Sequence, residues 1–311
     1  MKEPKDILAV NLVSAAKDLL KYWYILAIFG VLMVAVAYVY LKYTAKTYRV
    51  TASIVLKTEN KGSLAGGTDV LRAFDFMVQD KTFNNELFYM QSLPLLREVI
   101  NKMDVRTSYF MQDDKIPKRF TFGMQNIYKD SPILVIPEDG NSQPVNILFN
   151  VDILNENRFF ISAQGENVDL VDFRTERTVG RVNNFEISGI YDFGAIVNTE
   201  HASFRVLLNS NYNPGNFVGK NIFFQFNNYH WYVWRFKGGL SVNAQGMEST
   251  LAHLELKIDN VQLGIDFMNQ LIETYIEKNL EEANLLANKT IEHIEVQLEN
   301  ISGDLSLSER Q

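Results

Sequence analysis

The feature that most constrains this chain is a long apolar segment near its start. The 20 residues from Tyr22 to Leu41 contain no charged side chain. An α-helix rises ~1.5 Å per residue, so this segment reaches ~30 Å, which is the thickness of the hydrocarbon core of a bilayer. Aromatic side chains, which favour the headgroup level, gather at both of its ends. The sequence therefore predicts a transmembrane helix over residues 22–43, positioned by Tyr22, Trp23, Tyr24, Tyr38 and Tyr40.

A cleaved signal peptide is the main alternative to a retained anchor, because Ala35-Val36-Ala37 has the small-x-small cleavage pattern. That pattern lies inside the apolar run, which favours the anchor. Lysines are nearly balanced on the two sides of the run, so charge alone does not fix its orientation. Residues 1–21 are interpreted as a cytoplasmic amphipathic segment, either lying on the membrane surface or extending the anchor.

Composition and motif content argue against an enzyme. The chain has no cysteine and four dispersed histidines, and it has no motif for a phosphate loop, a dinucleotide or a serine nucleophile. We therefore predict no catalytic, cofactor-binding or metal-binding residue. Of the net charge of −7, residues 259–311 carry −8, from 11 acidic and three basic residues. The remainder is near neutral with no basic stripe, so nucleic acid is not an expected partner.

The middle of the chain has the pattern of an α+β domain. Residues 48–57 alternate with period two and predict a strand, and residues 70–91 and 93–103 predict helices, the second capped by Ser92. From about 132 to 258, short β-rich runs are separated by turn signals. We predict one mixed α/β domain over residues 44–258.

Residues 259–311 predict a long helix, because they contain no proline and few glycines. Apolar residues spaced three and four apart form a short coiled-coil seam. The seam indicates a coiled-coil partner or the first arm of a helical hairpin, and the alternative is a helix lying on its own domain. Its candidate interaction residues are Ile291, Ile294, Leu298 and Ile301.

The densest aromatic cluster is the run YHWYVWRF at 229–236. Trp231 and Trp234 are candidates for stacking on sugar rings, and Arg235 is a candidate for contact with an anionic group. The alternative for this run is packing in a core, against the membrane or against a neighbouring subunit.

Four segments, taken in order, resemble the Wzz-type chain-length determinants, or polysaccharide co-polymerases. They are YRVTASIVLK (48–57), NNELFYMQSLPLLREVINKMDV (84–105), NIYKDSPILV (126–135) and the helical segment 266–309. The third is similar to the exopolysaccharide-transport tyrosine autokinases of this family. Each pattern is loose, and their order and spacing make the set specific. The chain thus resembles the N-terminal, non-kinase half of such a protein.

The resemblance implies a bacterial inner-membrane protein with a cytoplasmic N-terminus and a periplasmic main domain. It implies a homo-oligomer that acts with a polysaccharide polymerase and export machinery on a growing capsular, O-antigen or exopolysaccharide glycan. Family members continue through a second transmembrane segment, and the autokinases through an ATP-binding domain. The chain ends at Gln311, so we expect a truncated arm and a kinase on a separate chain, if one acts.

The predicted function is therefore chain-length control by oligomeric scaffolding, without catalysis. A membrane-anchored carbohydrate-binding or envelope adhesion protein is the alternative. In that case the aromatic run would bind sugar and the helix would serve only as a stalk.

Overall fold

The structure is a computed structural model, and it describes residues 21–44, 46–56, 83–118, 121–138, 140–246 and 250–308. The predicted amphipathic segment before Lys21 and most of the predicted helix 70–91 lie outside these ranges, although residues 83–90 are helical. The helices are α2 (Trp23–Tyr43), α4 (Leu93–Lys102), α5 (Tyr229–Gly239) and α6 (Val261–Ser308), with 3-10 turns η1 (Tyr128–Asp130) and η2 (Pro214–Phe217).

All pairings between the described strands are antiparallel. The strands are β1 (Tyr48–Val55), β2 (Thr107–Gln112), β3 (Gln125–Asn126), β4 (Ile133–Pro137), β5 (Ser142–Pro144), β6 (Phe149–Ile153), β7 (Arg158–Asp172), β8 (Arg177–Asp192), β9 (Ile196–Asn198), β10 (Ser203–Leu208), β11 (Asn221–Phe226), β12 (Leu240–Ala244) and β13 (Leu251–Ile258).

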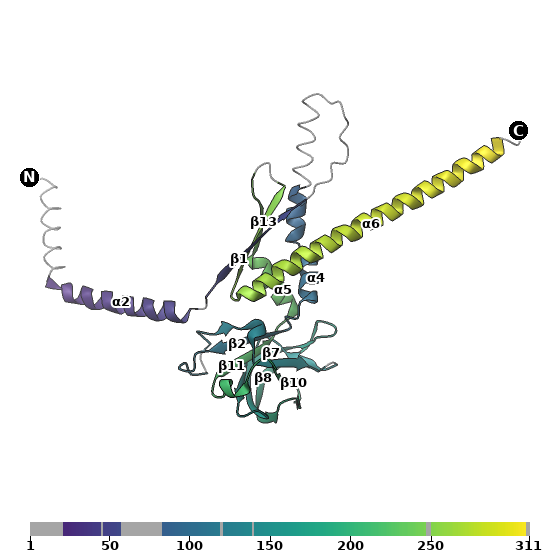
Figure 1. Cartoon of the computed structure of the whole chain (residues 1–311). Helices are drawn as coiled ribbons and strands as arrows, with labels where there is room; N and C mark the ends of the chain where they lie inside the picture. Colours follow the sequence, from purple (N-terminus) through teal and green to yellow (C-terminus); the bar gives the residue numbers. More distant parts are fainter. Residues whose placement is uncertain are drawn as a thin grey trace, which may run out of the picture.

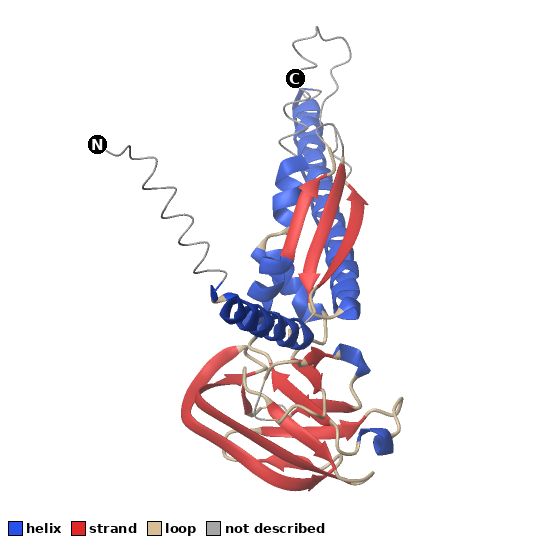
Figure 2. Cartoon of the chain, turned by 90° about the vertical axis from the view of Figure 1, so that its left-hand side faces the viewer, coloured by secondary structure: helices blue, strands red, loops and turns tan. Residues whose placement is uncertain are grey.

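Buried side chains within the predicted domain 44–258 form two separate clusters. The first, which we call the base, joins residues 48–56 and 83–105 to residues 228–275. The second, which we call the β body, comprises the intervening residues 106–227. Figures 1 and 2 show the base above the β body, with α2 leaving at the level where they meet.

The base is a three-stranded sheet, in the order β1-β13-β12, with helices on one face. Burial alternates along β13, as it does in a strand that has one face on a core. Figure 2 shows α6 and its neighbouring helices behind this sheet. The N-cap of α4 is Ser92, whose side chain accepts a hydrogen bond from the amide of Leu95, as predicted. The helices therefore close the base core from one side only.

The β body is built on a larger sheet, in the order β3-β2-β11-β6-β7-β5, to which β8 is added through β7. A second sheet, β4-β10-β9, packs with it. Phenylalanines dominate the core between them. Phe149 stacks on Phe224 at 4.6 Å between ring centroids, and Phe204 meets both rings edge-on.

The predicted fold class is wrong in its description of the C-terminal helix and of a mixed α/β domain. The body is sheet-rich α+β, and the structure does not show a coiled coil. The N-terminal turns of α6 pack on β1, β13 and α4, and Tyr275 is the last buried side chain among those of α6 that the structure describes. From Leu280 to Glu295, every side chain that the structure describes is exposed. Figure 1 shows this part of α6 extending away from the rest of the molecule. The coiled-coil spacing of its apolar residues was not enough to predict a coiled coil, because a coiled coil also needs a partner helix.

Asn227 joins the two cores. It is buried, and its side-chain amide donates to the carbonyl of Val105 at 2.7 Å and to the hydroxyl of Ser108 at 2.8 Å. Its own backbone amide donates to the carbonyl of Arg106 at 2.8 Å. The two chain crossings between base and β body are thereby held side by side.

We expect Asn227→Ala to lower the free energy of unfolding by about 1–3 kcal/mol, because the buried Val105 carbonyl loses its partner. The matched control is Asn243→Ala on β12, since Asn243 is exposed. That control should change the free energy by less than about 0.5 kcal/mol. Urea unfolding of the detergent-solubilised chain measures both. Equal midpoints for the two variants would contradict the role given to Asn227.

Candidate functional site

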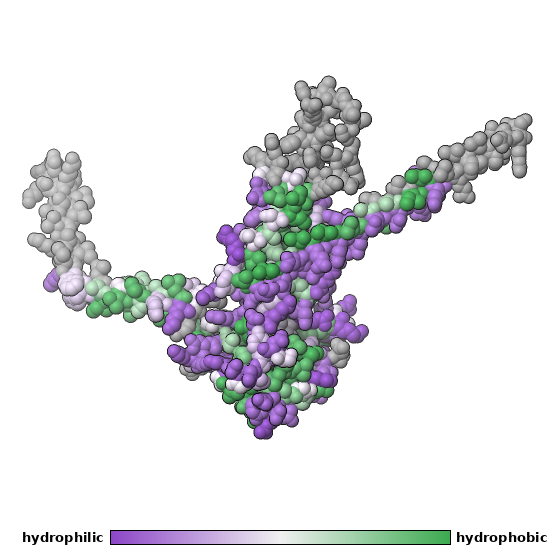
Figure 3. All heavy atoms as spheres, in the orientation of Figure 1, coloured by the Kyte–Doolittle hydropathy of each residue, from purple (hydrophilic) through white to green (hydrophobic). Residues whose placement is uncertain are grey.

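The predicted anchor residues all lie on or beside α2, and all are exposed. Trp23–Lys42 is long and apolar enough to span a membrane, and none of this segment is buried in the protein. An apolar helix in a protein core is covered by other side chains. α2 is not covered, so packing within this chain does not account for its apolar side chains. Figure 3 shows α2 as an apolar rod that projects from the body. Tyr22, Trp23, Tyr24, Tyr38 and Tyr40 are each more than 40% exposed.

Helical geometry divides the aromatic run. Asn228 caps α5 by accepting a hydrogen bond from the amide of Trp231 at 3.2 Å. Tyr232 and Phe236 then point into the base core, whereas Trp231 and Trp234 are more than half exposed. One helix therefore supplies both core residues and a solvent-facing tryptophan pair.

Arg235 does not stand free for an anionic ligand. Its Nη2 lies 2.7 Å from Oδ1 of Asp259, which comes just before α6. The pair links α5 to the start of the long helix. Its charge is already balanced within the base.

The predicted seam lies well away from the aromatic run. Ile291 and Ile294 are about half exposed, and both follow Tyr275, the last buried residue that the structure describes in α6, by four helical turns or more. Leu298 and Ile301 continue the same helix. The two predicted interaction sets therefore form two separate surfaces.

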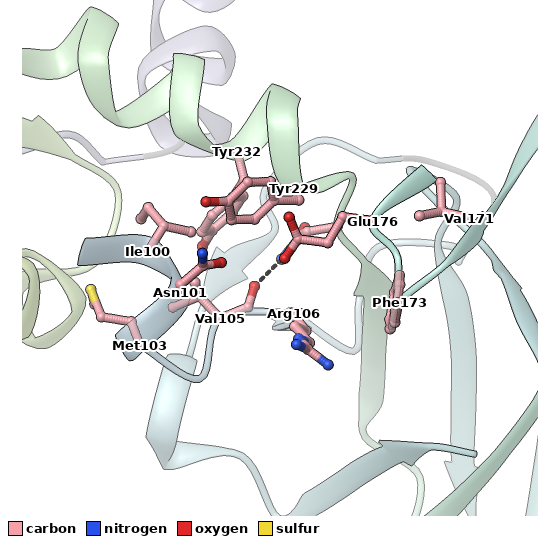
Figure 4. A pocket seen from close by; sticks show the side chains of 11 residues that line it. Ile100, Asn101, Met103, Val105, Arg106, Val171, Phe173, Glu176, Tyr229 and Tyr232 are labelled. Atoms are coloured by element: carbon pink, nitrogen blue, oxygen red, sulfur yellow. Dashed lines mark hydrogen bonds between the residues drawn. The ribbon is translucent and has the colours of Figure 1, made fainter. Parts of the chain in front are cut away.

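A narrow cleft with a volume of ≈ 30 Å³ lies where the base meets the β body (Figure 4). Its polar lining includes Asn101 from the end of α4, Arg106 before β2, and Glu176 from the β7–β8 turn. Tyr229 closes it from α5, as Figure 4 shows. The carboxylate and the guanidinium at the mouth of this cleft can hydrogen-bond the hydroxyl groups of a sugar. The apolar part of the lining is Ile100, Met103, Val105, Val171, Phe173 and Tyr232.

The β7–β8 turn determines where Glu176 lies. Asp172 accepts hydrogen bonds from the Arg174 amide and the Thr175 hydroxyl, at 2.8 and 2.9 Å, which fixes the turn. Glu176 then adopts a φ of +56°, which is uncommon outside glycine, asparagine and aspartate. The sequence singled out the aromatic run 229–236 but did not predict that it forms the helix α5, and Arg106 and Glu176 were not predicted as site residues. Asp172 was the local signal for the turn that carries Glu176, but a turn signal does not predict which part of the molecule the turn faces.

The cleft perturbs the phenol of Tyr229. Its hydroxyl donates to the carbonyl of Arg97 at 2.7 Å. Burial, followed by the nearby Glu176 carboxylate, raises the pKa of Tyr229 to about 12 from its usual 10. Both effects disfavour the phenolate.

We expect Glu176→Gln to lower the pKa of Tyr229, because it removes the negative charge while keeping the shape of the side chain. A spectrophotometric titration near 295 nm, with Tyr229→Phe subtracted to isolate this phenol, measures the shift. In the parent protein the unfolded chain loses this proton first, so Tyr229 makes stability fall as pH rises from 10 to 12. An unchanged pKa in Glu176→Gln would contradict the proximity of the two groups.

Within the described ranges, no group of three or more His, Cys, Asp or Glu side chains is placed to hold a metal ion. Comparison with known proteins finds no matching family model and no matching curated protein. A functional assignment must therefore come from the geometry of this chain: an exposed apolar helix, two linked cores, a cleft between them and a long helical arm.

Proposed function

We propose that this protein is a membrane-anchored, non-enzymatic polysaccharide co-polymerase module of the Wzz type. It sits in the bacterial inner membrane with its N-terminus in the cytoplasm and its base and β body in the periplasm. It regulates the chain length and export of a surface glycan as a homo-oligomeric scaffold beside the polymerase. This proposal combines the resemblance of four sequence segments with the path of the chain through the base.

The observation that carries it is that the anchor and the arm start at the same end of one sheet. β1 follows α2 after a short connection, and its first residue, Tyr48, pairs with Ile258 at the end of β13. α6 begins three residues later at Val261 and packs against β1 and β13. Its 48 residues correspond to ~72 Å at ~1.5 Å per residue. The base is thus an anchored platform from which a long arm projects.

Such an arrangement supports a scaffold mechanism. An anchored base holds each subunit at a fixed distance from the membrane, and a long arm extends the assembly along the growing glycan. In this mechanism chain length follows from the geometry of the assembly. The exposed tryptophan pair of α5 offers each base a surface toward neighbouring subunits or the polymerase.

The test is the length distribution of surface polysaccharide in the native host. Deletion of the gene should change the modal length, and expression of the full chain should restore it. Gly264→Leu should fail to restore it, because a Cβ there already lies 2.7 Å from Cγ2 of Val50 and 2.9 Å from Cγ2 of Ile258. This substitution pushes the arm off the base but leaves α2 intact.

The matched control is Leu280→Ala, on the exposed part of α6, which should restore the length distribution. Membrane-fraction abundance must be equal for all variants. An unchanged distribution in the deletion strain would contradict the proposal. The mass of the solubilised particle provides a second test, since a scaffold requires a discrete oligomer and a monomer contradicts it.

The cleft specifically favours a second candidate, a membrane-anchored carbohydrate-binding protein. It joins an aromatic residue, Tyr229, to the polar groups of Arg106 and Glu176. Binding of the host's purified surface glycan by the monomeric full chain, lost in Glu176→Gln and kept in the exposed control Glu186→Gln, would favour it. No loss in Glu176→Gln would remove the cleft as its site.

A further inference from the structure

Two loops form one end of the β body, and they are fixed to each other. Residues 113–124 follow β2, and residues 209–220 precede β11; we call their described parts the paired loops. β2 and β11 are neighbours, with Gln112 opposite Asn221. The side chain of Asn221 donates to the carbonyl of Ile116 at 3.1 Å, and Lys220 forms an ion pair with Asp114. The paired loops therefore form a single surface.

The last turn of α2 lies beside this surface. Lys42 lines a cleft of ≈ 380 Å³ together with Asp113, Asp114 and Lys220 of the paired loops. Lys46, just after the helix, lines a neighbouring cleft with Met124 and Gln125. Figures 1 and 2 show α2 meeting the molecule directly above the β body. The end of α2 and the paired loops are therefore neighbours in space.

The paired loops expose large apolar side chains among lysines. Phe122 is 46% exposed and Val218 is 50% exposed. The backbone holds Phe122 in place, since its carbonyl accepts a hydrogen bond from the side-chain amide of Gln112 at 2.8 Å. Surfaces that lie in a membrane interface combine apolar and basic side chains in this way. Lys118 and Lys220 are paired with Asp152 and Asp114, so apolar contact outweighs attraction to anionic lipid here.

We infer that the paired loops rest on the bilayer, with Phe122 and Val218 at the headgroup level. The inference rests on α2 spanning the membrane, because Lys42 then marks the boundary between hydrocarbon and headgroups. Residues that share a cleft with Lys42 lie in or next to the headgroup layer. The β body thereby gains a second membrane contact beside α2. Two contacts fix the orientation of the base, and therefore of α6, relative to the membrane.

The absence of cysteine allows a direct test with the full chain, since each introduced cysteine is the only one. Phe122→Cys and Val218→Cys probe the paired loops. Val34→Cys, exposed on α2, tests the anchor. Val179→Cys is the matched control: it is exposed and lies near the start of β8, whereas β6, which pairs with β11, joins the β7–β8 ladder near its other end.

Each variant carries an environment-sensitive fluorophore and is reconstituted into phosphatidylcholine vesicles with nitroxide-labelled headgroups or acyl chains. Because nitroxide quenching is short-ranged compared with the ~30 Å hydrocarbon core, headgroup quenching at 122 and 218 should exceed that at 179 by at least about twofold. Position 34 should be quenched by the acyl-chain label. Equal thermal midpoints show that the variants are folded.

Quenching at 34 with equal, weak quenching at 122, 218 and 179 overturns the inference and leaves the anchor in place. If position 34 is not quenched, α2 does not span the membrane. The inference then fails as well, because it rests on that role of α2. Neither result depends on which glycan the protein serves, so failure here is distinguishable from failure of the co-polymerase proposal.

Discussion

Phe149→Ala should reduce the free energy of unfolding of the β body by about 3–5 kcal/mol, the range typical of removing a fully buried phenylalanine. Phe149 has no exposed surface and stands at the centre of the aromatic cluster. Beyond the stack on Phe224, its ring meets Phe204, Phe226 and Phe185 edge-on, at 5.6, 5.8 and 5.9 Å. The substitution therefore leaves a large cavity and breaks several favourable ring contacts.

Urea unfolding of the solubilised chain measures the loss, and hydrogen–deuterium exchange of peptides covering β6 and β11 locates it. The matched control is Phe88→Ala, because Phe88 lies on the base and is 73% exposed. It should change stability by less than about 0.5 kcal/mol. Similar losses in the two variants would contradict the packing described for the β body.

Leu271→Ala should detach the first turns of α6 from the base, at a cost of about 2–5 kcal/mol. Leu271 is fully buried in the base core, which also contains Phe267 stacked on Phe236 at 4.3 Å between centroids. Truncation leaves a cavity under the helix. We expect faster hydrogen exchange over residues 261–275, with the β body unaffected, because its core is separate.

Leu280→Ala is the control for this prediction, since the same change is made in the same helix where the side chain is 59% exposed. Alanine has the highest helix propensity, so the control should be neutral or slightly stabilising. Exchange over 261–275 that rises equally in both variants would show that the start of α6 is not held by the base core.

Local signals in the sequence were sufficient to place several elements. A run of twenty residues without a charge predicted a helix over residues 22–43, and the structure has α2 at Trp23–Tyr43. Ser92 caps α4 because its side chain satisfies an amide of the first turn. Period-two alternation placed β1, and a β-rich run placed β13. Each of these signals lies within a single short segment of the sequence.

Other features depended on contacts between distant residues. β8 has only two buried side chains, Phe185 and Ile187, so few apolar residues mark it in the sequence. Its position is set by a long ladder with β7 instead. The seam on α6 has coiled-coil spacing, but spacing does not supply a partner helix.

The sequence by itself determined the apolar helix α2, the capped helix α4 and the extent of the long helix α6, because charge, capping and periodicity act over short distances along the chain. Only the tertiary structure decided that residues 106–227 form a core of their own and that Arg106, Glu176 and Tyr229 line one cleft. It also decided that α2 and α6 leave the same end of the base, because β1 and β13 pair across about 200 residues. Such pairings are selected by the packing of the whole chain, which no short segment encodes.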